Sequence, residues 1–158
     1  MSCKERLENY LRENGVLYEN QHHTRAITAQ EVAATEHVPG RMFAKTVMVL
    51  ADERLVMLVL PAPRHVNPKK AADVLGVEEV YLAGEKRFTE TFSDCEVGAM
   101  PPFGSLYGVP VYSDKALSED ETIVFRSGTH TDTMSVSYAD FEKLVKPTVA
   151  EFADAPSA

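Results

Sequence analysis

The first residue that could do chemistry is Lys45, which follows Phe43 and Ala44 and precedes the apolar run that starts at Thr46. A lysine at the end of a buried strand commonly extends its ammonium to solvent along its apolar stem. It can also hold the ammonium at a pocket mouth, where a phosphate or hydroxyl oxygen would bind. The residue types alone leave both interpretations open, and the first is the commoner one.

A second candidate is the loop over residues 98–104, which reads GAMPPFG. Its glycines allow a ligand to approach closely, and its adjacent prolines stiffen the backbone, so that neighbouring N–H groups can point in one direction. Such amides can stabilise an oxyanion without a charged side chain. A purely structural crossover loop is an equally good interpretation.

The third candidate is the segment Gly128, Thr129, His130 and Thr131. It is placed to form the turn between two strands, and a histidine in such a turn is most often exposed. Its functional interpretation depends on two hydroxyls and on an imidazole that titrates near neutral pH.

No pattern in the sequence predicts a cofactor or a metal ion. Phosphate-binding glycine loops, a catalytic-serine elbow and a His-Glu-x-x-His motif are all absent. The histidines are scattered, and the adjacent pair His22 and His23 would point to opposite faces of a strand. We therefore expect neither a cofactor nor a metal site.

Cys3 and Cys95 lie far apart in the sequence. Two thiols cannot form a disulfide framework, and the polar start of the chain carries no secretory signal, so we expect reduced cysteines in the cytoplasm. A nucleophile pair of Cys95 and His130 is possible in principle, but no catalytic signature surrounds Cys95.

The charge balance limits the function classes. The chain has 158 residues, with 16 Lys and Arg against 24 Asp and Glu, which gives a formal net charge of -8. This argues against a broad basic face for nucleic acid but permits a small local phosphate contact. The longest apolar run, residues 55–60, is too short to cross a bilayer. We expect no membrane association, and a monomer is favoured.

Local signals place these candidates on one α+β domain with a mixed, mostly antiparallel sheet. Capping patterns predict helices at residues 2–14, 28–36 and 68–75, around Phe88 and Phe92, and from Ser137 to Pro147. Apolar and β-branched runs predict strands at residues 16–22, 46–51, 55–60, 80–82, 109–112, 122–125 and 133–137. The second and third of these suggest a hairpin that is buried on both faces or lines a closed sheet. Residues 148–158 are acidic and rich in alanine, which predicts a frayed C-terminal tail after a domain of residues 1–147.

The three candidate segments together resemble the YbaK/prolyl-tRNA synthetase-associated editing domain family. Residues 43–46, 98–104 and 128–130 match its motifs in order and spacing, across residues 3–147. The resemblance implies a barrel-like mixed sheet with flanking helices. It also implies a free-standing hydrolase that removes wrongly attached amino acids from tRNA, with the acceptor end of mischarged tRNA as partner and an aminoacyl-tRNA synthetase as a further candidate.

The same resemblance assigns roles to individual residues. Lys45 would face the terminal adenosine and its phosphate, Gly98 would hold the ester carbonyl, and His130 would border the aminoacyl pocket. Substrate-binding residues would be Phe43, Thr46, Ala99, Met100, Pro101, Pro102, Phe103, Gly104, Gly128 and Thr129. Ala99, Pro101 and Arg126 depart from residues common in the family, which bears on amino-acid specificity.

The bulk of Phe43, Met100 and Phe103 predicts a narrow pocket and hence substrates with small amino acids. Two alternatives to this deacylase remain. One is a catalytically silent module of the same fold that senses an aminoacyl or nucleotide ligand or docks on a synthetase. The other is a hydrolase that uses Cys95 as its nucleophile.

Overall fold

A computed structural model describes residues 1–22 and 39–155 of the chain. The predicted helix at residues 28–36 lies outside this range. The helices are α1 (Cys3–Glu13), α3 (Pro68–Leu75), α4 (Glu85–Thr91) and α5 (Tyr138–Val145). The strands are β1 (Glu19–His22), β2 (Ala44–Ala51), β3 (Arg54–Pro61), β4 (His65–Val66), β5 (Val80–Leu82), β6 (Val111–Asp114), β7 (Thr122–Arg126), β8 (Asp132–Ser137), β9 (Thr148–Ala150) and β10 (Ala153–Asp154). Short 3-10 helices cover Gly40–Met42, Gly104–Tyr107 and Lys115–Glu119.

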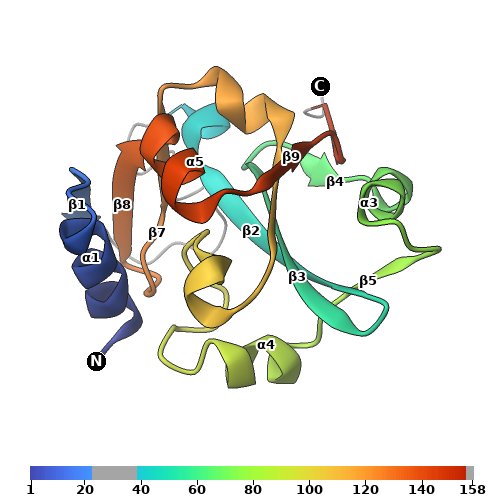
Figure 1. The fold of residues 1–158 in the computed structure, drawn as a ribbon, viewed down its shortest axis with the longest axis horizontal. Coiled ribbons are helices and arrows are strands. Elements are labelled where there is room, and N and C mark those ends of the chain that lie inside the picture. Colours follow the sequence, from blue (N-terminus) through green and yellow to red (C-terminus); the bar gives the residue numbers. More distant parts are fainter. Residues whose placement is uncertain (23–38, 156–158) are drawn as a thin grey trace.

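The strands form a mixed, mostly antiparallel set of sheets, as predicted. The central sheet has the order β5-β2-β3-β6-β9, in which only the β3–β6 and β6–β9 pairs are parallel. An antiparallel sheet, β1-β8-β7, lies beside it with α1, while α3 lies at the opposite side of the molecule (Figure 1). A pair of β4 and β10 completes the set. Within the described residues these sheets do not close into the barrel-like sheet that the resemblance implied.

The central hairpin has its predicted form. β2 and β3 pair from Ala44 opposite Pro61 to Ala51 opposite Arg54. Asp52 and Glu53 link them with positive φ angles of 49° and 66°, as a tight two-residue hairpin turn requires. The residues of β3 face two apolar clusters in alternation, so this strand is buried on both sides.

The helix ends follow their capping residues. The Ser2 hydroxyl accepts the Glu5 N–H at 3.1 Å, and α1 buries Leu7 and Leu11 against the core. The Asn67 and Ser137 side chains cap α3 and α5 in the same way. Among the described residues, no helix is long and apolar enough to cross a membrane.

Two strands begin later than predicted. β1 starts at Glu19 rather than at residue 16, and β6 starts at Val111 rather than at residue 109. Pro110 explains the second shift, because it has no N–H for a ladder and contributes only its carbonyl, which accepts the Met57 N–H at 2.9 Å.

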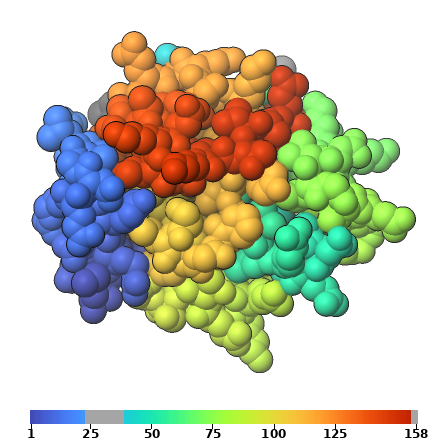
Figure 2. All heavy atoms as spheres, in the orientation of Figure 1, coloured from blue at the N-terminus to red at the C-terminus, as the bar shows by residue number. Residues whose placement is uncertain are grey.

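The prediction of a frayed end after residue 147 is wrong for residues 148–154. β9 pairs with β6 and β10 pairs with β4. Phe152 is fully buried, and the Asp114 carboxylate accepts its N–H at 2.9 Å. The space-filling view shows the C-terminal residues as a red band that reaches the green residues around β4 and α3 (Figure 2). One aromatic anchor among acidic and small residues was too weak a signal to predict this.

Candidate functional site

A small cleft brings the first candidate segment, residues 43–46, together with Gly98 and Met100 of the second. Its volume is about 40 Å³, and it lies between the start of β2, the loop after α4 and the end of β7. Its lining residues are Phe43, Ala44, Lys45, Thr46, Gly98, Met100 and Arg126. Residues more than fifty positions apart in the sequence therefore share one site.

The cleft lies where the central sheet meets the β1-β8-β7 sheet. Phe43 forms an isolated parallel bridge with Val124 of β7, and its carbonyl accepts the Ala62 N–H at 2.8 Å. The start of β2 is thereby held beside the end of β7. Lys45 and Arg126, each two residues beyond the bridge, come to the same cleft.

Lys45 is half-buried rather than extended into solvent. Its Nζ donates a hydrogen bond to the Ala62 carbonyl at 2.9 Å. Burial lowers the pKa of Lys45 below that of an ordinary lysine. Within the described part of the chain, no carboxylate forms an ion pair with this ammonium. An anionic ligand at the cleft would thus meet a cation that no carboxylate of residues 1–22 or 39–155 neutralises.

The loop backbone is fixed around Gly98, whose φ of +81° suits glycine. The Gly98 carbonyl accepts from Arg126 Nη1 at 3.2 Å, and the Ala99 N–H donates to the Glu96 carbonyl at 3.0 Å. The amides of Gly98 and Met100 donate to no atom of residues 1–22 or 39–155. These two donors belong to cleft-lining residues and have no partner in that part of the chain.

The other expected binding residues of this loop lie away from the cleft. Ala99, Pro101, Pro102, Phe103 and Gly104 are all buried. The Phe103 ring packs at 5.5 Å from that of Phe125 and 5.8 Å from that of Phe141. The structure therefore places these residues in or against the core, where they support the loop.

His130 lies behind the loop rather than in the lining of the cleft. Its Nε2 is 2.6 Å from the Val97 carbonyl, and its backbone N–H donates to Glu96 Oε1 at 2.7 Å. A Cβ built on Gly98 would lie 3.5 Å from the His130 ring. His130 therefore contacts the loop on which Gly98 stands.

The rest of the turn is occupied with structural contacts. The Thr129 hydroxyl donates to Asp132 Oδ2 at 2.6 Å. Burial alone would raise the pKa of Asp132, but hydrogen bonds from Thr129 and His22 and the charge of Lys4 lower it below the ordinary value. The Gly128 N–H donates to the Ala99 carbonyl, and the Gly128 carbonyl accepts the Glu96 N–H. Gly128 and Thr129 thus join the turn to the loop and to Asp132.

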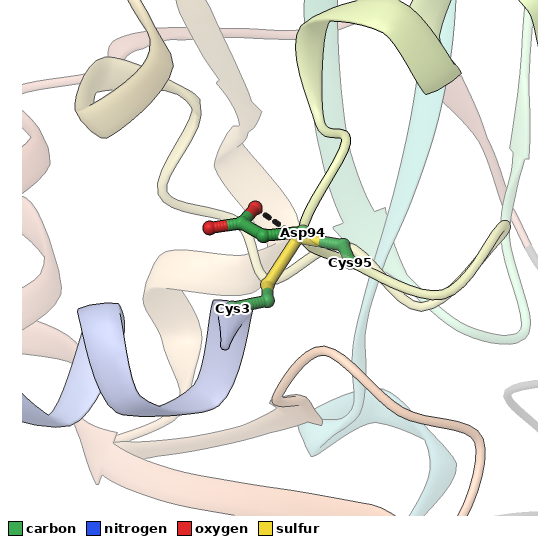
Figure 3. A group of neighbouring side chains, drawn as sticks. All are labelled: Cys3, Asp94 and Cys95. Atoms are coloured by element: carbon green, nitrogen blue, oxygen red, sulfur yellow. Dashed lines mark hydrogen bonds between the residues drawn. A yellow bond between two sulfur atoms is a disulfide. The ribbon is translucent and has the colours of Figure 1, made fainter. Parts of the chain in front are cut away.

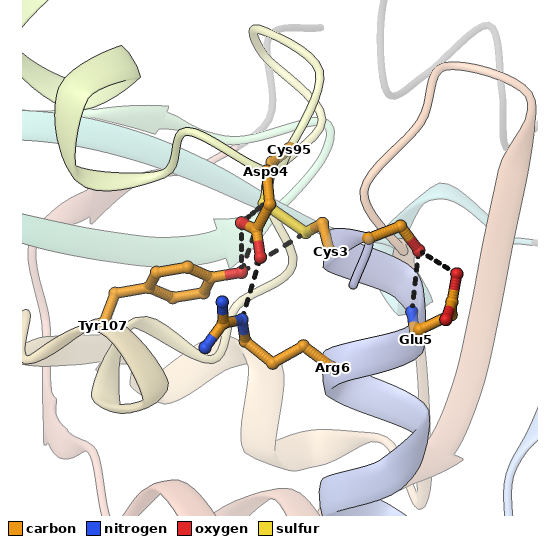
Figure 4. The surroundings of a disulfide bond; sticks show 7 residues. Cys3, Glu5, Arg6, Asp94, Cys95 and Tyr107 are labelled. Carbon is orange, nitrogen blue, oxygen red and sulfur yellow. Dashed lines mark hydrogen bonds and ion pairs between the residues drawn. A yellow bond between two sulfur atoms is a disulfide. The ribbon is translucent and has the colours of Figure 1, made fainter.

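The expectation of two separate, reduced cysteines is wrong in this structure. Cys3 and Cys95 form a disulfide between the first residue of α1 and the loop that leads to Gly98 (Figure 3). Neighbouring Asp94 accepts from Arg6 and Tyr107, each at 2.8 Å (Figure 4). No local pattern in the sequence indicates this pairing, because only the fold brings the two positions together.

This cluster is neither a nucleophile nor a ready metal site. A bonded Cys95 sulfur offers no thiolate, so the hypothesis of a Cys95-dependent hydrolase is wrong for this structure. The sulfur atoms and an Asp94 oxygen lie within 4.8 Å of one another. However, the sulfurs are bonded to each other and Asp94 is paired with Arg6, so the donors are already engaged.

A larger hollow elsewhere is a poorer candidate for a phosphate-bearing ligand. It measures about 500 Å³ and lies between the β2–β3 turn and residues 76–81. Asp52, Glu53, Glu78 and Glu79 line it. Their negative charge would repel a nucleic acid, whereas Lys45 and Arg126 at the smaller cleft would attract one.

Arg126 is the cleft residue that the sequence did not assign to the site. It was noted only as a departure from the family, and its position just before the Gly128 turn is the signal that could have indicated a site role. The predicted strand at residues 122–125 ends one residue before Arg126, whereas β7 includes it, and the bridge between Phe43 and Val124 brings that strand to Lys45.

Part of the chain is similar in sequence to proline–tRNA ligases. The chain is 28% identical over 89 residues to a proline–tRNA ligase of Bacillus cereus (strain AH187), and 29% identical over 89 residues to that of Bacillus cytotoxicus. The match covers 56% of this chain and 16% of each ligase.

Solved structures share the fold. A candidate trans-editing enzyme for prolyl tRNA synthetase superposes with a TM-score of 0.84 at 18% identity, over 98% of this chain and 99% of that one. Hypothetical protein APE2540 superposes with a TM-score of 0.84 at 19% identity, over 94% of this chain and 99% of that one.

The fold is thus that of an α+β domain shared with these solved structures. Residues 23–144 match the model of the aminoacyl-tRNA editing domain. The chain belongs to the aminoacyl-tRNA editing domain family.

Proposed function

We propose that the chain is a deacylase that acts in trans on mischarged tRNA and hydrolyses the ester of a small amino acid. Members of the editing-domain family typically have deacylase activity. The observation that carries the proposal is the cleft itself, which brings Lys45 together with Gly98 and Met100.

The reaction needs few protein groups, because an aminoacyl ester is already activated. A water oxygen attacks the ester carbonyl carbon, and the carbonyl electrons move onto oxygen to give a tetrahedral oxyanion. Collapse of this species breaks the bond to the ribose oxygen, which leaves with a proton taken from the attacking water. The free amino acid and the tRNA hydroxyl are the products.

In this proposal the amides of Gly98 and Met100 donate to the oxyanion, where preorganised donors lower the barrier most effectively. The Lys45 ammonium binds a phosphate or hydroxyl of the terminal adenosine and so orients the ester. His130 keeps the loop in place through the Val97 carbonyl. It is a positioning residue, since the cleft is lined by other side chains.

The size of the cleft supports a small amino acid. A cavity of roughly 10 to 15 Å³ holds one water molecule, so about 40 Å³ corresponds to a few water-sized groups. A methyl or hydroxymethyl group fits that volume, whereas a leucine or phenylalanine side chain does not. Alanine and serine esters are therefore the proposed substrates.

The net charge of -8 favours a short footprint on the acceptor end over a broad tRNA-binding face. The matched relatives are proline–tRNA ligases, and one similar structure is described as a candidate trans-editing enzyme for prolyl tRNA synthetase. A prolyl-tRNA synthetase is therefore the proposed partner that would supply mischarged tRNA.

The test is single-turnover deacylation of one tRNA body charged in turn with alanine, serine and phenylalanine, at fixed salt. We expect rapid release of alanine and serine and no release of phenylalanine above the uncatalysed rate. Equal rates for alanine and phenylalanine would contradict size exclusion. Binding of a non-hydrolysable acceptor-end analogue without turnover of any ester would instead support the silent ligand-binding module.

A further inference from the structure

Arg126 lines one side of the cleft, although its sequence context did not assign it to the site. It is the last residue of β7 and is half-buried. Its Nη1 reaches across to the Gly98 carbonyl at 3.2 Å, so the side chain links a strand end to the loop. The guanidinium and the Lys45 ammonium line the same small volume.

The apolar residues that line the cleft are part of the core, and moving them would cost stability. Phe43 is 1% exposed and Ala44 is 2% exposed, at the start of the long β2–β3 pairing. Met100 is 5% exposed and is followed by two prolines. Moving any of these would disturb close packing. Arg126 differs, because its long side chain enters the cleft from a strand end and is held at Gly98 by a hydrogen bond.

We propose that Arg126 is the specificity-determining residue that limits the size of the aminoacyl side chain in this cleft. The inference rests on the proposed deacylase function. Shortening Arg126 removes the wall on the Gly98 side without opening the core.

The experiment compares Arg126→Ala with wild type on one tRNA body charged with alanine, leucine or lysine. The measured quantity is the ratio of kcat/KM for the leucine ester to that for the alanine ester. We expect this ratio to rise at least about 10-fold in Arg126→Ala, since even one methylene of fit commonly changes kcat/KM by about 10-fold or more. A ratio is unaffected by the fraction of folded enzyme, so a merely structural loss would leave it unchanged.

Two matched variants separate size from charge. Arg126→Lys keeps a long cationic side chain and should keep both selectivities. Arg126→Gln keeps much of the length without the charge, so neither the leucine-to-alanine ratio nor the lysine-to-alanine ratio should change much if length sets the limit. Arg126→Thr, which suits the end of a strand, replaces Arg126→Ala if that variant does not fold.

The outcomes are distinguishable. An Arg126→Ala or Arg126→Thr enzyme that hydrolyses the alanine ester with an unchanged leucine-to-alanine ratio overturns the inference and leaves the proposed function standing. A wild-type chain that hydrolyses none of the esters overturns the proposed function, and the size limit with it.

Discussion

Cys3 and Cys95 are bonded to each other across 92 residues of sequence, and their bond lies directly beside the loop that carries Gly98. Cys3 also packs against the turn that contains Gly128, since a Cβ built on Gly128 would lie 2.8 Å from the Cβ and Sγ of Cys3. The start of α1 is thereby held against both the loop and the turn. The disulfide that stabilises the start of α1 therefore also constrains the backbone of the loop that carries Gly98.

Removing the disulfide should weaken the fold. A crosslink restricts the unfolded chain, and native disulfides typically contribute about 2 to 4 kcal/mol. We expect a loss of that size in the free energy of unfolding when Cys3 and Cys95 are both replaced by serine. Urea unfolding of the oxidised protein with and without a dithiol reductant measures it. The reductant should leave the double-serine variant unchanged, and equal stability of all forms would contradict the prediction.

Lys45→Ala should lose most deacylase activity while remaining folded. A charge-assisted contact is worth roughly 1.5 to 3 kcal/mol, so the loss should be at least about 10-fold in kcat/KM. Lys69→Ala is the matched control, because Lys69 is exposed on α3. Near-normal turnover by a folded Lys45→Ala protein would show that the ammonium has no part in catalysis.

The lowered pKa of Lys45 predicts opposite effects of alkaline pH on binding and on stability. Binding of a non-hydrolysable acceptor-end analogue should weaken as Lys45 loses its proton, with a midpoint below the ordinary 10.5. Between the folded and unfolded pKa values the unfolded chain binds the proton more tightly, so this group's contribution to stability rises with pH. Titrations of binding and of urea unfolding check both trends, and Lys45→Ala should abolish both.

His130→Ala should reduce deacylation less than Lys45→Ala does. Its ring is bound to the Val97 carbonyl, so we assign it to positioning rather than proton transfer. His130→Gln, whose amide can donate to the same carbonyl, should restore much of the rate. The pH–rate profile is the decisive measurement: loss of one of its limbs in His130→Ala would require a general acid–base role instead.

Gly128→Ala should destabilise the protein more than Gly15→Ala. Both glycines have positive φ, of +112° and +67°, but a Cβ at Gly15 meets nothing within 4 Å. Gly15→Ala should therefore cost only the backbone term of about 1 to 2 kcal/mol. Gly128→Ala adds a clash with Cys3, worth roughly a further 1 to 3 kcal/mol. Equal unfolding midpoints for the two variants would contradict this account.

Local chemistry explains what could be predicted from the sequence. Ser2, Asn67 and Ser137 marked helix starts correctly, because a cap acts on N–H groups two or three residues away. The apolar pattern likewise predicted the β2–β3 hairpin. The pairings of β9 and of Cys3 with Cys95 depend on residues far apart in sequence, which no local pattern encodes.

The candidate site shows the same division. Lys45 and Gly98 were predicted from their own segments and do line one cleft. Phe103 was expected to bind substrate, but its apolar ring is equally suited to the core where it lies. Arg126 was not assigned, because its place beside Lys45 follows from contact between two sheets. The roles of these residues in hydrolysis are the predictions to be tested.

The pairing of β9 with β6 and of β10 with β4 also determines the order in which these strands can fold during synthesis. A ribosome releases the chain from its N-terminus, so β4 and β6 emerge well before the strands that cover them. Until residues 148–154 follow, β6 presents an open edge, and Phe152 is missing from its core cluster. The docking of this segment therefore follows the synthesis of β4 and β6, and a nascent chain stalled before it would carry an edge open to pairing with other chains.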